Sequence, residues 1–512
     1  MTGAEAVLRT LAAAGVRACF ANPGTSEMHL VTALDGVPEV RPVLALFEGV
    51  AAGAADGYGR MTGEPAATLL HLGPGLGNAV ANLHNAYKAR TPLVNLVGDH
   101  AVLHRPLGAP LTSDVEAVAR PVSHWLDSAR DARSAPTAAA AAVAAARGRG
   151  GGVATLVLPA DAGWEQSPGP VAPVSPSSRA PVPAGAVEAA AVALRGARNG
   201  AIVLGGHATG EPGLRAAAAT GARLLHDRFP PRLERGAGRP AVPPVPYLTD
   251  MALAALADVD VLVCAGAPPP VGFFAYPNLP SHPVGPDTDV HVLAGPQEDA
   301  VAALEELAEA LGRPGRSAPD PPRPAPPPEG PLDVFTFGAA VAAALPEGAI
   351  VVDEAVTGAE PTLTACAGAP PHDWLFLSGG AIGWGLPAAT GAAVACPDRP
   401  VLCLEADGSA MYTLQSLWTQ AREGLDVTTV ILANRSYAIL EFEMRRVGAA
   451  VGAAARELFD LDRPPLDFVA LAGGMGVPGR RVQDTAELGA ALREALAEPG
   501  PHLIEAVISS PS

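Results

Sequence analysis

Residues 403–437, CLEADGSAMYTLQSLWTQAREGLDVTTVILANRSY, decide the fold class of this chain. The pattern predicts a buried apolar strand, an acidic turn, a helix of about four turns, a second β-branched strand and a polar turn that begins at Asn434. Such a parallel βαβ unit brings the carboxyl ends of both strands to one edge of the sheet. We therefore expect Asp407, in the first turn, to converge with Asn434, in the second.

These two side chains indicate a magnesium–diphosphate site. A carboxylate and an amide make a poor cage for a bare cation, but they suit Mg²⁺, which fills its remaining positions with phosphate oxygens and water. The helix that follows Gly408 and Ser409 would present free N–H groups to such an anion. An Asp-Gly turn and a later Asn are also ordinary loop features, so the alternative at this point is a pair of structural loops.

Length, charge and cysteine usage exclude several protein classes. At 512 residues the chain is too long for one core, and we expect about two to four domains. The net charge is −18 without a run of Lys or Arg, which argues against nucleic acid as a partner. The amino terminus lacks the order of a signal peptide, so a cytoplasmic protein is expected, and the run 379–396 is too broken by glycine to span a membrane. Five scattered cysteines predict reduced core thiols: Cys19, Cys264, Cys366, Cys396 and Cys403.

Two proline-rich segments, 167–185 and 313–331, indicate linkers between three parts of the chain. In each part, short apolar strands alternate with helical patterns, which is typical of parallel sheets. We therefore predict an α/β fold of three doubly wound parallel-sheet domains at 1–168, 186–312 and 332–512. The expected strands include 43–47, 67–71, 93–97 and 154–158 in the first domain, and 349–352, 401–404, 427–432 and 502–507 in the last.

Three polar residues of the first domain follow predicted strands. Glu48 opens a helix after PVLALF, His71 ends a strand, and Thr25 lies in the turn ANPGTSE. Each has an ordinary structural interpretation: a carboxylate that complements a helix dipole, a structural histidine and a helix cap. Because all three lie at strand-end turns of one domain, we expect them to share one opening of the sheet.

The middle domain carries one glycine-rich turn, VLGGHATG, after a predicted strand. It lacks the full GxGxxG pattern, and no acidic residue follows at the usual distance. The sequence therefore gives no adequate motif for a nucleotide or flavin there, and FAD is an unlikely cofactor.

Six motifs resemble the thiamine diphosphate-dependent enzymes of the acetolactate synthase and benzoylformate decarboxylase group, nearest to actinobacterial acetolactate-synthase-like large subunits. They are FANPGTSEMH, LFEGVAAGAADGYGRMTG, LLHLGPGLGNAVANLHNAYKARTPLVNLVGDH, APLTSDVEAVARPVSHW, GGAIGWGLPAATGAAVACPDRPVLCLEADGSAMYTLQSLWTQA and NRSYAIL. The most specific element is the acidic turn at Asp407 followed 27 residues later by Asn434, in a chain that also carries Glu48.

The resemblance implies a pyrimidine-binding domain at 1–168, an accessory middle domain and a diphosphate-binding domain at 332–512. The active site would lie between the first domain of one subunit and the third of another, in a homodimer or homotetramer. Mg²⁺ would be held by Asp407, Asn434 and the backbone carbonyl of Ser436. The implied cofactor contacts are Gly380, Ile382, Gly408, Ser409, Thr357 and Tyr437.

The resemblance also assigns chemical roles. Glu48 matches the carboxylate that protonates the cofactor's aminopyrimidine ring. His71 and Thr25 match positions that relay protons or orient the substrate carboxylate. The substrate would be a small 2-oxo acid that loses CO₂, after which a proton gives an aldehyde and a second carbonyl gives a carboligation product.

Three positions depart from the family pattern. Ala406 precedes Asp407 where the family usually has glycine, which puts the metal turn in question if that position needs a positive φ. Phe274 lies about where decarboxylase-like members carry a second catalytic histidine, which argues against simple aldehyde release. Ile439 fills a substrate-pocket position and favours a small aliphatic acyl donor. Together with Leu111, Phe274 and Ile439 are the expected substrate-pocket residues.

Three functions remain as alternatives. The first is a decarboxylase/carboligase of acetolactate synthase type. The second is a benzoylformate decarboxylase-like enzyme, favoured by His71 and disfavoured by Phe274 and Ile439. The third is a catalytically lapsed paralogue that binds cofactor and acts as a partner subunit, suggested by Ala406 but opposed by the intact Glu48.

Overall fold

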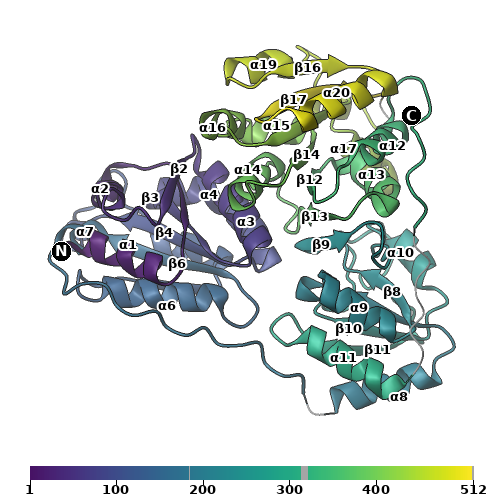
Figure 1. The fold of residues 1–512 in the computed structure, drawn as a ribbon, viewed down its shortest axis with the longest axis horizontal. Coiled ribbons are helices and arrows are strands. Elements are labelled where there is room, and N and C mark those ends of the chain that lie inside the picture. The colour runs from purple at the N-terminus through teal and green to yellow at the C-terminus, as the bar shows by residue number, and fades with distance from the viewer. Residues whose placement is uncertain (184, 313–320, 510–512) are drawn as a thin grey trace.

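The computed structural model describes residues 1–183, 185–312 and 321–509, and it confirms the predicted α/β class (Figure 1). Three sheets, each flanked by helices, follow one another along the chain. Within the described residues, no helix is both long and apolar enough to cross a membrane. All five cysteines are free thiols; four are buried and Cys396 is partly exposed. Part of the expected linker 313–331, residues 313–320, lies outside the described residues.

The first sheet has six parallel strands in the order β2-β1-β3-β4-β6-β5. Helices α1 (Gly3–Ala13) and α6 (Ala135–Arg147) bury their alanine and leucine side chains on one face, and α3 (Glu48–Thr62) and α4 (Leu72–Ala89) cover the other. The strands are β1 (Ala18–Ala21), β2 (Arg41–Leu44), β3 (Ala66–His71), β4 (Leu93–Asp99), β5 (Trp125–Ser128) and β6 (Val153–Pro159).

The third sheet, in the order β16-β17-β15-β14-β12-β13-β9, contains the stretch that decides the fold. Strands β14 (Val401–Ala406) and β15 (Val427–Ala433) pair in parallel with Ala406 opposite Leu432, as predicted. Both turns therefore leave the sheet at the same edge. The remaining strands are β9 (Arg232–Arg235), β12 (Ile350–Glu354), β13 (His372–Phe376), β16 (Gly479–Val482) and β17 (His502–Val507).

The prediction of one continuous helix between β14 and β15 is wrong. The chain forms two helices there, α15 (Asp407–Thr413) and α16 (Ser416–Glu423). The Thr413 hydroxyl donates to the Gly383 carbonyl at 3.0 Å. The Thr419 hydroxyl donates to the Leu44 carbonyl of the first domain, also at 3.0 Å. The two helices are thus held by different tertiary partners. These contacts override the local sequence pattern, which is helical over the whole segment.

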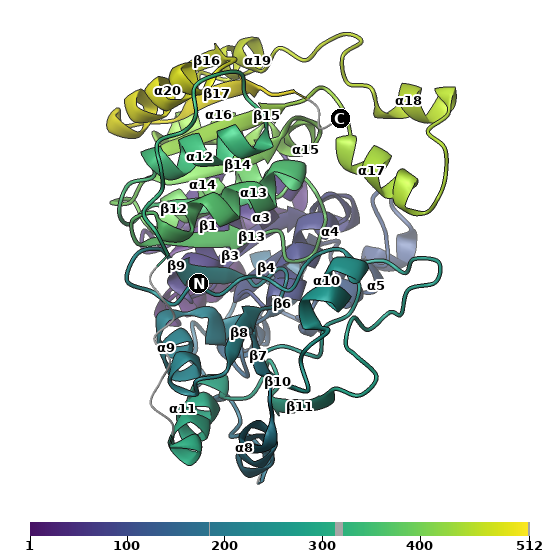
Figure 2. The same cartoon turned by 90° about the vertical axis from the view of Figure 1, so that its right-hand side faces the viewer.

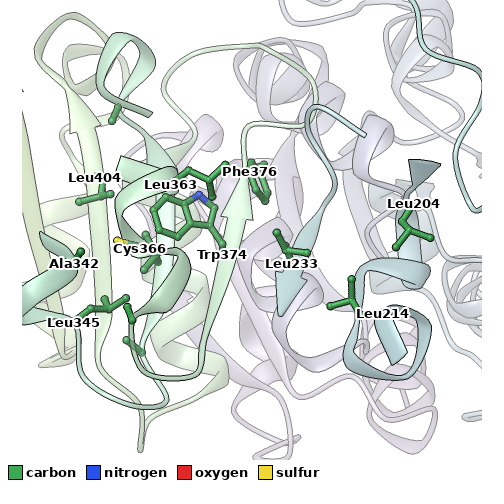
Figure 3. Close-up of a cluster of buried hydrophobic side chains, with 14 of the residues drawn as sticks. Leu204, Leu214, Leu233, Ala342, Leu345, Leu363, Cys366, Trp374, Phe376 and Leu404 are labelled. Carbon is green, nitrogen blue, oxygen red and sulfur yellow. The ribbon is translucent and has the colours of Figure 1, made fainter. Parts of the chain in front are cut away.

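The middle sheet has the order β11-β10-β7-β8, from strands β7 (Gly200–Leu204), β8 (Arg223–His226), β10 (Val261–Ala265) and β11 (Asp289–Ala294). One further strand of this segment, β9 (Arg232–Arg235), instead pairs antiparallel with β13 at the edge of the third sheet (Figure 1). Leu233 of β9 lies between Trp374 on one side and Leu214 on the other (Figure 3). The middle and third domains therefore share a continuous apolar core.

The first and third domains meet where α3 packs against α14 (Gly385–Ala395). A Cβ atom on Gly391 would overlap the Ala54 carbonyl, and one on Gly57 would overlap the Ala388 carbonyl. Glycine at these two positions is what lets the helix backbones come into contact. The interface consequently fixes the first domain closely against the third.

A fully buried ion pair lies within this interface. Arg60 Nη2 is 2.7 Å from Asp56 Oδ2, and the two side chains are 1% and 0% exposed. Trp384 Nε1 donates to Asp56 Oδ2 at 2.6 Å, and the Arg60 guanidinium lies 4.4 Å from the centre of the Trp384 ring. Arg60 also donates to the carbonyls of Phe376 at 2.6 Å and Pro231 at 3.2 Å. One guanidinium thus joins all three domains.

We expect Arg60→Met to lower the free energy of unfolding by about 3–5 kcal/mol, because it leaves the Asp56 carboxylate buried without its cation. Urea unfolding followed by tryptophan fluorescence measures this. Arg9→Met, at the solvent-exposed pair with Glu5, is the control and should cost less than about 1 kcal/mol. Equal losses in the two variants would contradict the role of the buried pair.

Candidate active site

The turns after β14 and β15 meet at the predicted edge of the third sheet. Asp407 is the first residue of α15 and is 4% exposed. Its carboxylate accepts from the backbone N–H groups of Arg435, at 2.6 Å, and Gly408, at 2.9 Å. The Asn434 side-chain oxygen accepts from the Ser436 N–H at 3.0 Å. The expected convergence of Asp407 and Asn434 is therefore present in the structure.

The donor set at this edge suits a hard cation. It consists of oxygen atoms only: the Asp407 carboxylate, the Asn434 amide oxygen and the Ser436 carbonyl that the sequence predicted. Burial raises the pKa of Asp407 to about 6, although backbone hydrogen bonds from Arg435 and Gly408 lower it. A bound cation would restore the charged form, so the residues present fit Mg²⁺.

Ala406 does not strain the turn. It is the N-cap of α15 with φ −78° and ψ 146°, a conformation open to any residue. Gly408 and Ser409, the expected diphosphate contacts, follow in the first turn of α15. A Cβ atom at Gly408 would overlap the Tyr437 ring, so glycine is required for Tyr437 to close over this turn.

An apolar cavity of about 610 Å³ adjoins the edge, between the middle segment and the third domain. Figure 2 shows the flank of the molecule on which α17 (Ala438–Arg446) lies above α10 (Thr249–Leu256), and there Arg446 pairs with Asp250 at 2.6 Å. Five predicted site residues line the cavity: Thr357, Gly380, Ile382, Ser436 and Ile439. The structure thus brings together positions from three separate segments of the third domain.

Two expected pocket residues do not line this cavity of the single chain. Phe274 is 55% exposed, and its ring packs edge-on against Phe273, which does line the cavity, with ring centres 5.0 Å apart. Leu111 is exposed on a loop of the first domain. Their role in a substrate pocket remains a prediction.

Glu48 and His71 both lie next to Gly75 in the first domain. A Cβ atom on Gly75 would be 3.2 Å from both Glu48 Oε1 and His71 Cβ. Glu48, the first residue of α3, is 7% exposed and accepts from Asn78 Nδ2 at 2.9 Å. Thr25 begins the short 3₁₀ turn Thr25–Glu27, whose N-cap is Gly24, so Thr25 is not the cap that the sequence suggested.

The turn expected between His71 and the following helix is absent, because α4 begins at Leu72 directly after β3. Leu72 takes a φ of 51°, which turns the chain from the strand into the helix within one residue. Pro74 then lies in the first helical turn, where a missing N–H costs no hydrogen bond. His71 is therefore fixed between two regular elements.

Sequence reasoning missed Glu27 as part of this site. Glu27 is completely buried, and its Oε2 lies 2.9 Å from His71 Nδ1 and accepts from the Gly24 N–H at 2.9 Å. Ser26 Oγ is 3.0 Å from the same His71 nitrogen. A carboxylate on Nδ1 favours the tautomer that leaves Nε2 as the free ring nitrogen. The motif ANPGTSE contained the signal, but the pairing spans 44 residues.

Glu354 is a second residue that sequence reasoning missed. Its buried carboxylate accepts from three consecutive backbone N–H groups, those of Gly383, Trp384 and Gly385. Burial raises the pKa of Glu354 to about 7, although these hydrogen bonds lower it. Burial and the charge of Glu354 raise the pKa of neighbouring Glu405 well above its usual value. Glu354 therefore anchors the loop that carries Gly380 and Ile382.

The raised pKa of Glu354 makes stability depend on pH. Between its unfolded value of 4.5 and its folded value of about 7, the folded state binds more protons, so stability falls as pH rises through this window. For protein in EDTA, we expect the thermal midpoint to fall from about pH 5 to about pH 8, and to fall less in Glu354→Gln. The control variant Glu347→Gln, at an exposed position, should show the same change of the thermal midpoint with pH as the parent. The same slope in Glu354→Gln would contradict this assignment.

Glu48 and His71 do not line the apolar cavity within the described part of the same chain. The first and third domains nevertheless touch nearby, because Asn82 donates to the Gly383 carbonyl at 3.1 Å and Asn85 to the Ala381 carbonyl at 2.8 Å. The site residues thus form two sets, one in each domain.

The sequence matches two parts of one enzyme family. Residues 1–118 match the thiamine pyrophosphate enzyme N-terminal TPP binding domain, and residues 362–506 match the C-terminal TPP binding domain. The first match contains Thr25, Glu48 and His71, and the second contains Asp407 and Asn434. These five residues therefore fall within the two matched TPP-binding domains.

Similar proteins cover the whole chain. The Mycobacterium tuberculosis protein IlvX, named as a candidate acetolactate synthase large subunit, is 54% identical over 100% of this chain and 99% of its own length. The benzoylformate decarboxylase of Pseudomonas aeruginosa is 30% identical over 96% of each chain. The solved thiamine diphosphate-dependent 4-hydroxybenzoylformate decarboxylase of Rhodococcus jostii superposes with a TM-score of 0.87 at 25% identity, over all of both chains. The chain therefore belongs to the thiamine diphosphate-dependent enzymes, in the acetolactate synthase and benzoylformate decarboxylase group.

Proposed function

We propose that this protein is a thiamine diphosphate- and Mg²⁺-dependent 2-oxo acid decarboxylase/carboligase of acetolactate synthase type. The observation that carries the proposal is the meeting of Asp407 and Asn434 beside the cavity lined by Gly380 and Ile382. Asp407, Asn434 and the Ser436 carbonyl would hold Mg²⁺, with Gly408, Ser409, Thr357 and Tyr437 around the cofactor. When bound, thiamine diphosphate supplies the nucleophilic carbon and the electron sink for decarboxylation.

The first domain would supply the acid–base groups. Glu48 is buried, and Asn78 holds one of its oxygens, so its other oxygen is available to a ring nitrogen of the cofactor. His71, oriented by Glu27, would present Nε2 to the substrate, and Thr25 lies on the same turn as Ser26. Because this set does not line the cavity of its own chain, we propose an active site shared between subunits of a homodimer or homotetramer.

For the acyl donor we propose a small aliphatic 2-oxo acid, since Ile439 occupies the wall of the cavity. A second candidate is a benzoylformate decarboxylase-like activity on an aryl 2-oxo acid. Two observations favour it: the Glu27–His71–Ser26 network, and the aromatic side chains that line the same cavity. The rings are those of Phe229, Tyr247, Phe273, Phe335, Phe376 and Phe442.

The test is turnover of pyruvate and of benzoylformate with thiamine diphosphate and Mg²⁺, with CO₂ release measured and products identified. We expect CO₂ and acetolactate from pyruvate. Glu48→Gln should lower kcat by about 10²-fold or more, because it removes an acid–base group. Glu39→Gln, on the surface of the same domain, should leave kcat unchanged.

Aldehyde as the sole product, from the aryl acid, would instead establish the second candidate. Cofactor binding that Asp407→Ala abolishes, without turnover by the parent on any 2-oxo acid, would establish the lapsed paralogue. FAD has no place in the proposal, and a visible spectrum of the purified protein tests that directly.

A further inference from the structure

Two arginines, Arg228 and Arg445, line the apolar cavity. Arg445 is well paired, because its Nη2 lies 2.6 Å from Glu441 Oε1, and 62% of its side chain is exposed to water. Arg228 lies between β8 and β9 and is largely buried, with 18% of its side chain exposed. The two cations therefore differ in how well water and a carboxylate satisfy them.

Arg228 is only loosely paired. Among residues 1–183, 185–312 and 321–509, its one carboxylate partner within 4.0 Å is Glu360, and the Nη2 to Oε2 distance of 3.5 Å is longer than a usual hydrogen bond. Glu360 is 46% exposed, so water competes for its charge. The Nε of Arg228 is buried and has no partner within the described part of the chain. An anion in the cavity would supply hydrogen bonds that this guanidinium lacks.

The buried carboxylates of the cavity wall are engaged by other donors. Asp353 accepts from Trp374 Nε1 at 3.1 Å and from the Ala355 N–H at 3.0 Å. Burial raises the pKa of Asp353, although these hydrogen bonds lower it. Glu354 accepts from three backbone N–H groups, as described above. Neither carboxylate takes the place of a close partner for Arg228.

Arg228 lies at the end of a row of contacts that begins at the expected cofactor loop. The tip of the Phe273 ring reaches Gly380, since a Cβ atom on Gly380 would be 2.8 Å from Phe273 Cζ. Phe229 packs edge-on against Phe273, with ring centres 5.7 Å apart. The Arg228 guanidinium lies 5.1 Å from the centre of the Phe229 ring. Two aromatic rings of the cavity wall therefore lead from Gly380 to Arg228.

The chemistry restricts which carboxylate Arg228 can usefully hold. The carboxylate beside the carbonyl of a 2-oxo acid donor leaves as CO₂, so a cation that holds it stabilises the substrate more than the transition state. That carboxylate is also bonded directly to the reacting carbon, whereas Arg228 is separated from Gly380 by two rings. A second carboxylate at the far end of the donor meets both conditions, because it is retained and reaches further along the wall.

We propose that Arg228 determines specificity for a 2-oxo dicarboxylic acid, by holding the carboxylate at the far end of the donor. The inference rests on the proposed function, because it names the donor of the same site. C1 of the donor leaves as CO₂, the electron pair of the C1–C2 bond stays on C2 and forms a bond there to a proton or to a second carbonyl carbon, and the far carboxylate is unchanged. A guanidinium suits this role because it forms paired hydrogen bonds with a carboxylate.

The first test is calorimetric titration of the full chain, saturated with thiamine diphosphate and Mg²⁺, with glutarate and with uncharged glutaramide. Neither probe has a 2-oxo group, so the result does not depend on turnover. We expect glutarate to bind about tenfold more tightly than glutaramide. Arg228→Met should remove that difference, because it removes a charge-assisted hydrogen bond. Glu360→Gln should tighten glutarate binding, because it removes the carboxylate that competes for Arg228.

Arg445→Gln is the matched control, because it removes the other arginine of the cavity wall. Its exposed position should leave the affinity for glutarate within about twofold of the parent's. No loss in Arg228→Met, or an equal loss in Arg445→Gln, would overturn the proposal. Weaker binding by Glu360→Gln would show that Arg228 serves only its contact with Glu360, and it overturns the proposal even where Arg228→Met does not fold.

The second test compares the kinetics on 2-oxoglutarate with those on 2-oxopentanoate, which has the same chain length without the far carboxylate. We expect the parent to favour 2-oxoglutarate. Arg228→Met should raise KM for 2-oxoglutarate about tenfold with little change in kcat, because the contact is equal in the ground and transition states. KM for 2-oxopentanoate should not rise. Aldehyde in place of acetolactate from pyruvate in this variant would assign Arg228 to the acceptor and overturn its assignment to the donor.

The two tests separate this inference from the proposed function. Glutarate binding that depends on Arg228, without turnover of any 2-oxo acid, would refute the proposed function while supporting the carboxylate site. Turnover of pyruvate, with the same ratio of KM values for 2-oxoglutarate and 2-oxopentanoate in the parent and in Arg228→Met, would support the function and overturn the inference.

Discussion

The buried Asp56–Arg60 pair is the contact on which the arrangement of the three domains depends. Two charges removed from water cost several kcal/mol each, and only well-made hydrogen bonds offset that cost. Here Asp56 accepts from Trp384, while Arg60 donates to Phe376 and to Pro231 of the middle segment. The pair therefore tolerates only one placement of the first domain against the other two, and that placement lets α3 and α14 come into contact.

This rigid interface adjoins the loop that carries the expected cofactor contacts. On one side, Asn82 and Asn85 of the first domain donate to the carbonyls of Gly383 and Ala381. On the other, Glu354 accepts from the backbone of the same loop. Carbonyls and N–H groups held in this way keep their directions without help from a ligand, which is how a site is preorganised for charge. Gly380 and Ile382 are therefore presented to the cavity by a fixed backbone.

Part of the fold and of the candidate site was predictable because it depends on residues that are neighbours in the sequence. A run such as VTTVILAN predicts a strand and the turn after it, and parallel pairing then requires Asp407 and Asn434 to leave the same edge. The helix between them was mispredicted because Thr413 and Thr419 bind different distant carbonyls. Strand β9 was missed for a similar reason, since its pairing with β13 spans more than a hundred residues and leaves no periodic signal.

The sequence by itself determined the α/β class, most strand positions and the residue types available for chemistry, because hydrophobic period and turn composition are properties of neighbouring residues. Only the tertiary structure decided which of those residues act together. Glu27 reached His71, and Glu354 reached the loop at Gly383, through the packing of separate elements. Burial, which sets the pKa of Asp407 and Glu354, likewise exists only after those elements have packed.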